Sequence, residues 1–353
     1  MLLAALLACP LMGAAGGAGG EEPSVRVLLR ETAGPIRVGV PGGHLTTLEA
    51  VPGGLRADGR PVAGASWSLD GALLRVDQQR VRGGIEVLPG PAGLLVVNRV
   101  PLEHYVLGTL GREVYPGWEA ETLKAQAVVT RTYALYRARR SQDPWHLEAT
   151  TRGQVYGGAD AEWEAGRKAV AATRGEYLAW GGEPILAAFH SASGGRTASS
   201  EEVWGQAFPY LVSVDVADEQ DSPDTYWRTP VSGTTLVRAL APFGIQVGRL
   251  VALRVAERSP SGRVRSLRVQ GREGEAHIQA RALREALGAE VIRSTLFEIR
   301  EAPEGWVFVG SGHGHGVGMS QWGAQAMARG GASYREILSA FYPGARILQG
   351  ARP

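Results

Sequence analysis

Residues 101–136, PLEHYVLGTLGREVYPGWEAETLKAQAVVTRTYALY, decide how the rest of the chain is organised. The stretch predicts two helices, because apolar residues recur at helical spacing on both sides of a single break. That break is Tyr115-Pro116-Gly117, where proline lacks the N–H that a helix needs and glycine favours a turn. We therefore expect two adjacent helices joined by a short connection.

The first predicted helix places a carboxylate on the face that should be buried. At 100° per residue, one stripe of this helix carries Leu102, Val106, Thr109 and Glu113. An ionised carboxylate is costly to bury. Glu113 must therefore find a partner or stay protonated with a raised pKa.

The second predicted helix carries positive charge in the same way. Lys124 and Arg131 share a stripe with apolar residues, and Arg131 lies near the centre of the apolar arc. The pattern alone leaves two interpretations open. Glu113 and Arg131 form a structural ion pair inside an ordinary core, or Glu113 is an acid that does chemistry in a buried site.

The same stretch resembles the signature of the stage II sporulation protein D family, the SpoIID/LytB domain. The resemblance continues in the same order over most of the chain. Its further blocks are QVYGG (154–158), FHSASGGRT (189–197), VWG (203–205), PYLVSV (209–214), GHGVGMSQWGAQAMA (314–328) and YREILSAFYPG (334–344).

The resemblance implies a peptidoglycan lytic transglycosylase that cleaves the MurNAc–GlcNAc linkage and leaves 1,6-anhydro-MurNAc ends. Glu113 matches the family's catalytic acid, and glycan stripped of its stem peptides is the implied substrate. The family also includes enhancers of a cell-wall amidase, so a non-catalytic glycan-binding protein with an amidase partner is the alternative. Motif position assigns the following residues to glycan binding: Lys124, Gln126, Arg131, Gln154, Tyr156, Ser193, His315 and Gln321.

Two other chemistries are disfavoured by the sequence. Some family members carry a zinc site, with cysteines shortly before the glutamine that matches Gln154. No cysteine is present there, so we expect neither a metal nor another cofactor. His313 and His315 lie two apart, but no acidic residue or cysteine lies close to them in the sequence to complete a ligand set. Ser193 precedes two glycines and lacks the G-x-S-x-G pattern of a hydrolase nucleophile.

The composition is that of a soluble globular protein. The 353 residues are 44% hydrophobic and 20% charged, and they are enough for two or three domains. The formal net charge is +2, and no long block of Lys or Arg is present. Nucleic acid is therefore not an expected partner.

The first twenty residues, MLLAALLACPLMGAAGGAGG, resemble a secretory leader followed by a small-residue tether. Their apolar run is too short to span a membrane as a stable helix. Cys9, the one cysteine of the chain, follows Leu-Leu-Ala as in a bacterial lipobox. Either a lipid anchors the protein at Cys9, or cleavage near Ala15 or Ala18 releases it. Both alternatives place the protein outside the cytoplasm, in the cell envelope.

The remaining pattern predicts an α+β fold. Short apolar runs separated by Gly and Pro indicate a small N-terminal β module. Near the C-terminus a glycine-rich loop opens a helix near Ser320, and Ser333 with Glu336 predicts a capping box on the last helix. The expected division is a leader and tether at 1–20, the β module at 21–100, a mixed α/β catalytic core with its two-helix unit at 101–231, an inserted β-rich subdomain at 232–310, and the C-terminal half of the core at 311–353.

Overall fold

The computed structural model describes residues 22–150 and 153–350. The predicted leader and Cys9 lie outside these residues. The helices are α1 (Leu102–Glu113), α2 (Ala120–Ala138), α3 (Glu164–Ala172), α4 (Ser200–Trp204), α5 (Gly233–Leu240), α6 (Ala280–Leu287), α7 (Gln321–Arg329) and α8 (Tyr334–Phe341), with 3₁₀ turns η1 (Gly158–Ala161) and η2 (Ala241–Phe243). Within the described ranges, no helix is long and apolar enough to cross a membrane. Together with the sheets below, these helices confirm the predicted α+β class.

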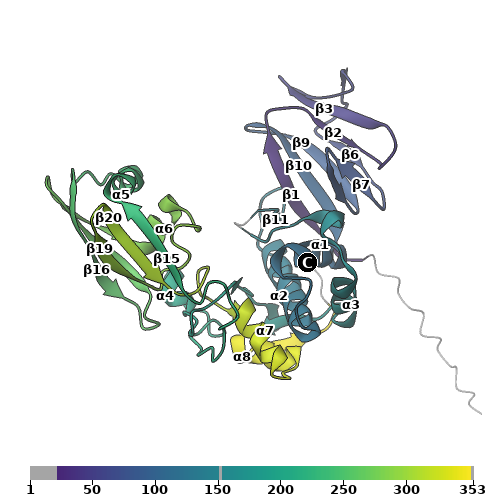
Figure 1. The fold of residues 1–353 in the computed structure, drawn as a ribbon. Coiled ribbons are helices and arrows are strands. Elements are labelled where there is room, and N and C mark those ends of the chain that lie inside the picture. Colours follow the sequence, from purple (N-terminus) through teal and green to yellow (C-terminus); the bar gives the residue numbers. More distant parts are fainter. Residues whose placement is uncertain (1–21, 151–152, 351–353) are drawn as a thin grey trace, which may run out of the picture.

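Two β-rich arms stand on a helical base (Figure 1). The first arm is the N-terminal module, built from β1 (Ser24–Thr32), β2 (Ile36–Gly39), β3 (Leu45–Val51), β4 (Gly54–Ala57), β5 (Arg60–Pro61), β6 (Trp67–Leu69), β7 (Leu74–Val76), β8 (Gln79–Val81), β9 (Gly84–Gly90) and β10 (Gly93–Pro101). One sheet has the order β11-β1-β10-β9-β6, where β11 is Leu147–Glu148, and the other has the order β5-β4-β3-β2-β7-β8. The predicted β module is therefore present.

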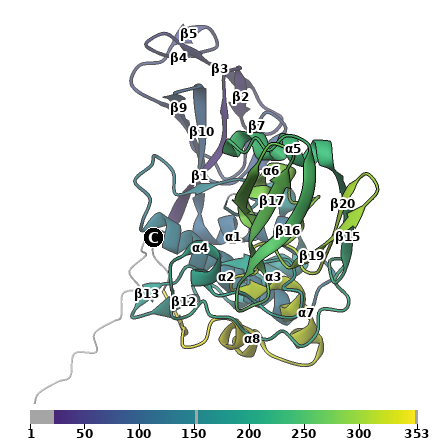
Figure 2. The same ribbon diagram turned by 90° about the vertical axis from the view of Figure 1, so that its left-hand side faces the viewer.

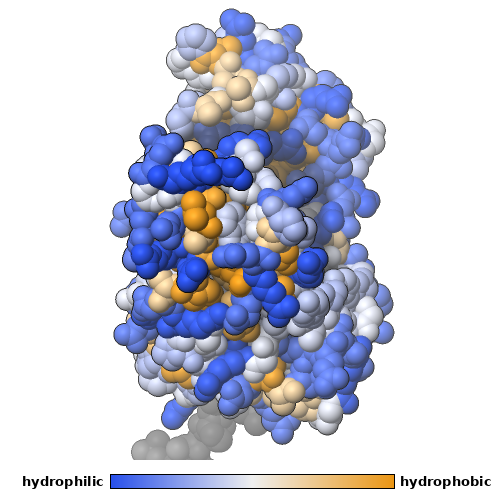
Figure 3. All heavy atoms as spheres, turned by 60° about the vertical axis from the view of Figure 1, so that its left-hand side comes forward, coloured by the Kyte–Doolittle hydropathy of each residue, from blue (hydrophilic) through white to orange (hydrophobic). Residues whose placement is uncertain are grey.

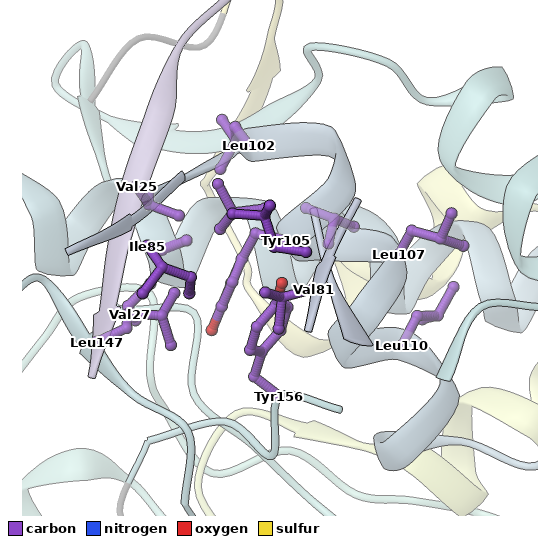
Figure 4. Packing of buried hydrophobic residues seen from close by; sticks show 14 of the residues in the cluster. Val25, Val27, Val81, Ile85, Leu102, Tyr105, Leu107, Leu110, Leu147 and Tyr156 are labelled. Carbon is purple, nitrogen blue, oxygen red and sulfur yellow. The ribbon is translucent and has the colours of Figure 1, made fainter. Parts of the chain in front are cut away.

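The core of this module extends directly into α1. Val25 and Val27 of β1 are fully buried, as are Leu102 and Tyr105 of α1. Figure 4 shows these side chains packed together with Ile85 of β9. Burial of this kind contributes roughly 1.5–3 kcal/mol for each large apolar side chain, so the module fixes the position of α1.

Helix α2 lies at the centre of the molecule and belongs to two cores. Leu123 and Leu135 pack in the core shared with the β module, whereas Val128 and Val129 pack against the C-terminal part of the chain. Arg131 is completely buried among them. Its Nε and Nη2 donate to the two carboxylate oxygens of Glu103 at 2.9 and 2.6 Å. This bidentate pair joins the second half of α2 to the first turn of α1.

The C-terminal part closes the base of the molecule. The strands here are β12 (Tyr177–Trp180), β13 (Glu183–Pro184), β14 (Phe189–His190), β21 (Met319–Ser320) and β22 (Arg346–Leu348). β22 pairs with β12, and β21 runs parallel to β14. Ser320 caps α7, and the predicted capping box of Ser333 and Glu336 is confirmed on α8.

Three aromatic rings hold the turn between α1 and α2 against α7. The ring of Trp118 lies 5.4 Å from that of Tyr115 and 5.0 Å from that of Trp322. Tyr115 and Trp322 are 5.9 Å apart, so each ring contacts the other two. Aromatic pairs at such distances stabilise their contact beyond the area that they bury. The predicted Pro-Gly break is therefore a fixed corner of the fold.

The inserted subdomain forms the second arm, which comes to the front in Figure 2. Its sheets are β15-β20-β19 and β16-β17-β18, formed by β15 (Trp227–Ser232), β16 (Leu250–Arg258), β17 (Val264–Gly271), β18 (Glu275–Gln279), β19 (Phe297–Ala302) and β20 (Gly305–Gly310). They enclose a separate core with α5 and α6. On the face shown in Figure 3, apolar residues gather in the middle and hydrophilic residues surround them. β15 begins at Trp227, before the expected boundary at residue 232, and α5 was not expected. The division into domains stays a prediction.

We predict that Glu103→Gln destabilises the protein by about 3–5 kcal/mol, because it leaves the buried Arg131 guanidinium without a balancing charge. Glu164→Gln is the matched control. The Glu164 pair with Lys168 is exposed on both sides, so its loss should change stability by less than about 1 kcal/mol. Urea unfolding of the two variants measures the difference, and equal midpoints would show that the Glu103–Arg131 pair is dispensable.

Candidate functional site

Glu113 is the last residue of α1 and lies half-buried, with no ion-pair partner among the described residues. Its Oε1 accepts a hydrogen bond of 2.7 Å from the backbone N–H of Val155. Burial raises the pKa of Glu113 to about 7, and the Val155 hydrogen bond only partly opposes this rise. The suggested ion pair of Glu113 with Arg131 is wrong, because Arg131 pairs with Glu103.

Gln321 connects the end of α1 to the C-terminal half of the chain. It is the first residue of α7, and its Nε2 donates to the backbone carbonyl of Glu113 at 2.9 Å. The same Nε2 lies 3.3 Å from Oε1 of Gln126, which is buried on α2. Two of the residues assigned to glycan binding thus meet at the catalytic candidate. In this structure Gln321 binds the Glu113 backbone, and Gln126 binds Gln321.

A pocket of about 660 Å³ opens in front of Glu113. The helices that line it are the end of α1, the second half of α2, α4 and the start of α7. The loop before η1, the segment around β14, the glycine-rich loop and the inserted subdomain complete the lining. The lining residues are Glu113, Tyr133, Gly153, Val155, Leu186, Ala188, Phe189, His190, Ser191, Trp204, Arg284, Ala289, His313, Gly314, His315 and Gln321. Among these described residues, Glu113 is the only carboxylate.

Two neutral histidines form part of the wall. The rings of His190 and His315 lie 5.7 Å apart, and His315 also contacts Trp204. Burial lowers the pKa of His315 to about 4 and that of His190 well below its ordinary value. The Val317 N–H donates to Nδ1 of His315, and Nδ1 of His190 lies 3.1 Å from the Val317 carbonyl. Neither ring therefore adds positive charge near Glu113 at neutral pH.

His313 has an acidic neighbour that the sequence did not reveal. Its Nδ1 lies 3.1 Å from Oδ2 of Asp224, whose other oxygen accepts from Arg293 at 2.6 Å. Within residues 22–150 and 153–350, however, no three His, Cys, Asp or Glu side chains are grouped to hold a metal ion. The absence of a metal remains a prediction.

The glycine-rich loop needs its glycines for close contact. Gly318 has a φ of 71°, and a Cβ there would lie 2.0 Å from the Ala188 carbonyl oxygen. Gly314 has a φ of 109°, and its Cβ would lie 2.8 Å from that of His190. Such φ values and distances exclude ordinary side chains. The loop can therefore pass directly beside β14, which places His315 and Gln321 at the pocket.

A buried carboxylate, Glu219, fixes the neighbouring turn. It accepts hydrogen bonds from the N–H groups of Ser193, Gly194 and Gly195 and from the Ser193 hydroxyl. The Ser320 hydroxyl, at the start of α7, donates to it as well. Ser193 is fully buried by these contacts. Glu219 thus ties the turn after β14 to the helix that carries Gln321.

Comparison with known proteins identifies the family of this chain. Residues 91–180 match the family model described as stage II sporulation protein, and residues 206–318 match that of a domain of unknown function. Stage II sporulation protein D of Bacillus amyloliquefaciens is 32% identical over 270 residues, which cover 72% of this chain and 76% of that protein. The chain belongs to the stage II sporulation protein D family.

Two other relatives show how widely the family match extends. An uncharacterized protein of Brachyspira hyodysenteriae is 33% identical over 270 residues, or 75% of this chain and 72% of that protein. An amidase enhancer of Bacillus subtilis is 28% identical over 286 residues, or 68% of this chain and 40% of that protein. The family resemblance read from the sequence motifs is therefore confirmed.

Several family-signature residues face away from the pocket. Lys124 pairs with Glu121 at 2.6 Å and lies over the ring of Tyr334. Arg131 is enclosed by its pair with Glu103. These side chains hold helices together in this structure, and their assignment to glycan binding stays a prediction.

Gln154 and Tyr156 also belong to the core around α1. The Tyr105 hydroxyl donates to Gln154 at 2.9 Å, and the Tyr156 hydroxyl donates to Asn98 at 2.9 Å. Their neighbours Gly153 and Val155 line the pocket instead. In this extended segment, successive residues point to opposite sides.

The sequence did not identify the backbone donor of Val155, the wall residue Trp204 or Arg284 of the inserted subdomain. Every residue except proline has a backbone N–H, so the residue type at 155 could not show that this group binds Glu113. Trp204 falls within the VWG block at 203–205, for which the family resemblance implied no role. Arg284 lies on a short helix far from any family motif, so no pattern linked it to the site.

We predict that Glu113→Gln stabilises the protein at pH 8. The folded-state pKa of Glu113 is about 7, against an ordinary value of 4.5. Below pH 4.5 the group is neutral in both states, and its cost to stability grows until the pH passes 7, where it reaches about 3 kcal/mol. Glutamine is neutral and keeps an acceptor for Val155.

Thermal unfolding at pH 4 and pH 8 tests this directly. Glu113→Gln should raise the melting temperature at pH 8 and leave it nearly unchanged at pH 4. The exposed Glu164→Gln should show no such difference between the two pH values. A lower melting temperature for Glu113→Gln at pH 8 would mean that the ionised carboxylate stabilises the fold.

Proposed function

We propose that this protein is a peptidoglycan lytic transglycosylase of the cell envelope, with Glu113 as its acid and base. The observation that carries the proposal is a single carboxylate at the pocket, with a pKa of about 7 and no cationic partner among the described residues. A group with this pKa is present in both protonation states near neutral pH, as general acid–base catalysis requires.

The reaction can proceed with this one carboxylate. Protonated Glu113 donates its proton to the glycosidic oxygen, and the bond from that oxygen to C1 of MurNAc breaks. The 6-hydroxyl of the same MurNAc then forms a bond to C1, and its proton returns to Glu113. The products are a 1,6-anhydro-MurNAc end and a GlcNAc 4-hydroxyl, without any consumption of water. Glycoside hydrolases usually need a second carboxylate to activate water or to attack C1.

The surrounding residues support this role of Glu113. The Val155 N–H binds Oε1 and directs the carboxyl group, while Gln321 holds the carbonyl of the same residue. His190 and His315 stay neutral because burial lowers their pKa. A charged imidazolium in this pocket would instead lower the pKa of Glu113 and reduce its acidic form.

The second candidate function is non-catalytic. One relative is named an amidase enhancer, and it aligns over 40% of its own length. In that case the pocket would bind glycan strands and present them to a cell-wall amidase. Both candidate functions require glycan binding, so only turnover distinguishes them.

Turnover of Glu113→Gln provides the first test. The variant should keep its affinity for glycan and lose about two to four orders of magnitude in kcat, which is the usual contribution of a general acid–base. In the wild type, kcat/KM should fall as the pH rises above 7, since the free enzyme then loses its proton from Glu113. A variant that cleaves at the wild-type rate would exclude Glu113 as the acid.

The mass of the products provides the second test. Digests of purified glycan should contain 1,6-anhydro-MurNAc ends, which are lighter by one water than hydrolytic ends. Reducing MurNAc ends would show hydrolysis and a second carboxylate that acts on water. No cleavage of intact or stripped glycan would favour the amidase-enhancer function.

A further inference from the structure

The inserted subdomain contributes a positive charge to the pocket of Glu113. Arg284 lies on α6, where its neighbour Leu283 is buried in the core of the subdomain. Arg284 itself lines the same pocket as Glu113, together with Ala289 just beyond the helix. The subdomain therefore completes a site whose acid lies on α1, about 170 residues earlier in the sequence.

The Arg284 guanidinium is held in place without an acidic partner. Its Nε and Nη2 donate to the Arg293 carbonyl oxygen at 3.3 and 3.1 Å. In the described parts of the chain, no carboxylate lies within ion-pair distance of it, and Nη1 has no hydrogen-bond partner. The adjacent Glu285 pairs with Arg281 instead. A half-buried cation that lacks a counter-charge is costly to keep, unless a ligand supplies that charge.

Arg284 also marks the point where two cavities adjoin. A second pocket of about 440 Å³ lies between α4 and the subdomain, and it shares Trp204, Arg284 and the glycine-rich loop with the first. Its other arginines are already engaged. Arg265 pairs with Glu257 at 2.8 Å, and Arg263 donates to the carbonyls of Ser193 and Arg196. Arg263 is also buried, whereas Arg284 is partly exposed and is the one described arginine that lines both pockets.

Resting on the proposed function, we propose that Arg284 binds the lactyl carboxylate of the MurNAc unit whose C1 faces Glu113. An arginine fork matches a carboxylate in shape and charge. The lactyl group is attached to the reacting sugar ring, so it stays in the same pocket when C1 lies at Glu113. Carboxylates of a stem peptide lie several bonds further away. In peptide-bearing glycan the lactyl group is an uncharged amide, and it offers Arg284 no counter-charge.

The consequence is a role for the inserted subdomain in substrate choice. A strand whose stem peptides have been removed carries the charge that Arg284 lacks, and an intact strand does not. Residues 206–318, which match a domain of unknown function, would then select the state of the substrate while α1 supplies the chemistry.

Calorimetric titration with the inert Glu113→Gln protein tests the proposal without cleavage. The ligands are stripped MurNAc–GlcNAc oligosaccharides as the free acid, the same oligosaccharides with the lactyl group as a methyl ester, and peptide-bearing oligosaccharides. The free acid should bind about tenfold more tightly than the ester, as expected for one charge-assisted hydrogen-bonded contact. Adding Arg284→Gln should remove this preference, whereas Arg284→Lys should keep part of it.

Arg268→Gln is the matched control. Arg268 lies in the same subdomain, pairs with Glu275 and lines neither pocket, so its removal should leave the tenfold preference intact. The proposal would be overturned if Arg284→Gln weakened the binding of the free acid and of the methyl ester equally. It would also be overturned if the protein that carries Arg284 bound the two ligands equally well. If Arg284→Gln weakens the binding of the peptide-bearing oligosaccharide as much as that of the free acid, Arg284 binds a carboxylate of the stem peptide and not the lactyl group.

The two proposals can fail separately. If the carboxylate preference depends on Arg284 but the wild type cleaves nothing, the binding site stands and the transglycosylase function is wrong. If the wild type makes 1,6-anhydro ends and Arg284→Gln does so with unchanged KM on the free acid, the function stands and Arg284 has no part in recognition.

Discussion

The buried guanidinium of Arg131 determines the electrostatics of the two-helix unit. A charge in that position needs a carboxylate, and Glu103 supplies one through two hydrogen bonds from the opposite end of α1. Nη1 of Arg131 also donates to the Glu176 carbonyl, which connects the pair to the segment before β12. Because Glu103 satisfies the cation, Glu113 is left alone at the far end of the helix. Burial of this carboxyl group raises its pKa to about 7, and no nearby cation opposes the rise.

Among the described residues that line the Glu113 pocket, none on the side of the core is a Lys, an Arg, an Asp or a second Glu. His190 and His315 are neutral, and the cations nearest in sequence, Lys124 and Arg112, are not among its lining residues. The opposite wall, from the inserted subdomain, brings one guanidinium. The site therefore has an acid on one side and a cation on the other, supplied by different parts of the chain. In this arrangement the proposed acid, Glu113, and the proposed substrate-binding group, Arg284, are separate.

The sequence predicted the elements of the site better than their contacts. The Pro-Gly break, the apolar stripe of α1, the helix start near Ser320 and the capping box on α8 are local signals, and the structure confirms them. The partner of Arg131 was not local. A helical stripe shows that a charge points inward, but the crossing of α1 and α2 determines which carboxylate it meets. In the same way, motif position could not show that Gln154 and Tyr156 face the core while Val155 faces the pocket.

β15 and α5, which lie near the expected boundary of the inserted subdomain, were not predicted, for similar physical reasons. β15 contains Pro230, which argues against a strand in sequence, but β15 is the edge of its sheet, where a missing N–H is tolerated. Helix α5 has only eight residues and begins with Gly233 followed by two threonines, so its intrinsic helix signal is weak. Its serine cap and its packing in the subdomain core stabilise it instead.

The contact between Gln321 and Glu113 bridges 208 residues of chain, and it has a consequence for biosynthesis. The N-terminal module and α1 can fold while the ribosome is still making the rest, since their contacts are closer in sequence. The pocket cannot form then, because α7 has not yet been made. An unfinished or truncated chain thus carries Glu113 without the helix that holds it in place. The order of synthesis itself delays assembly of the site until the chain is nearly complete.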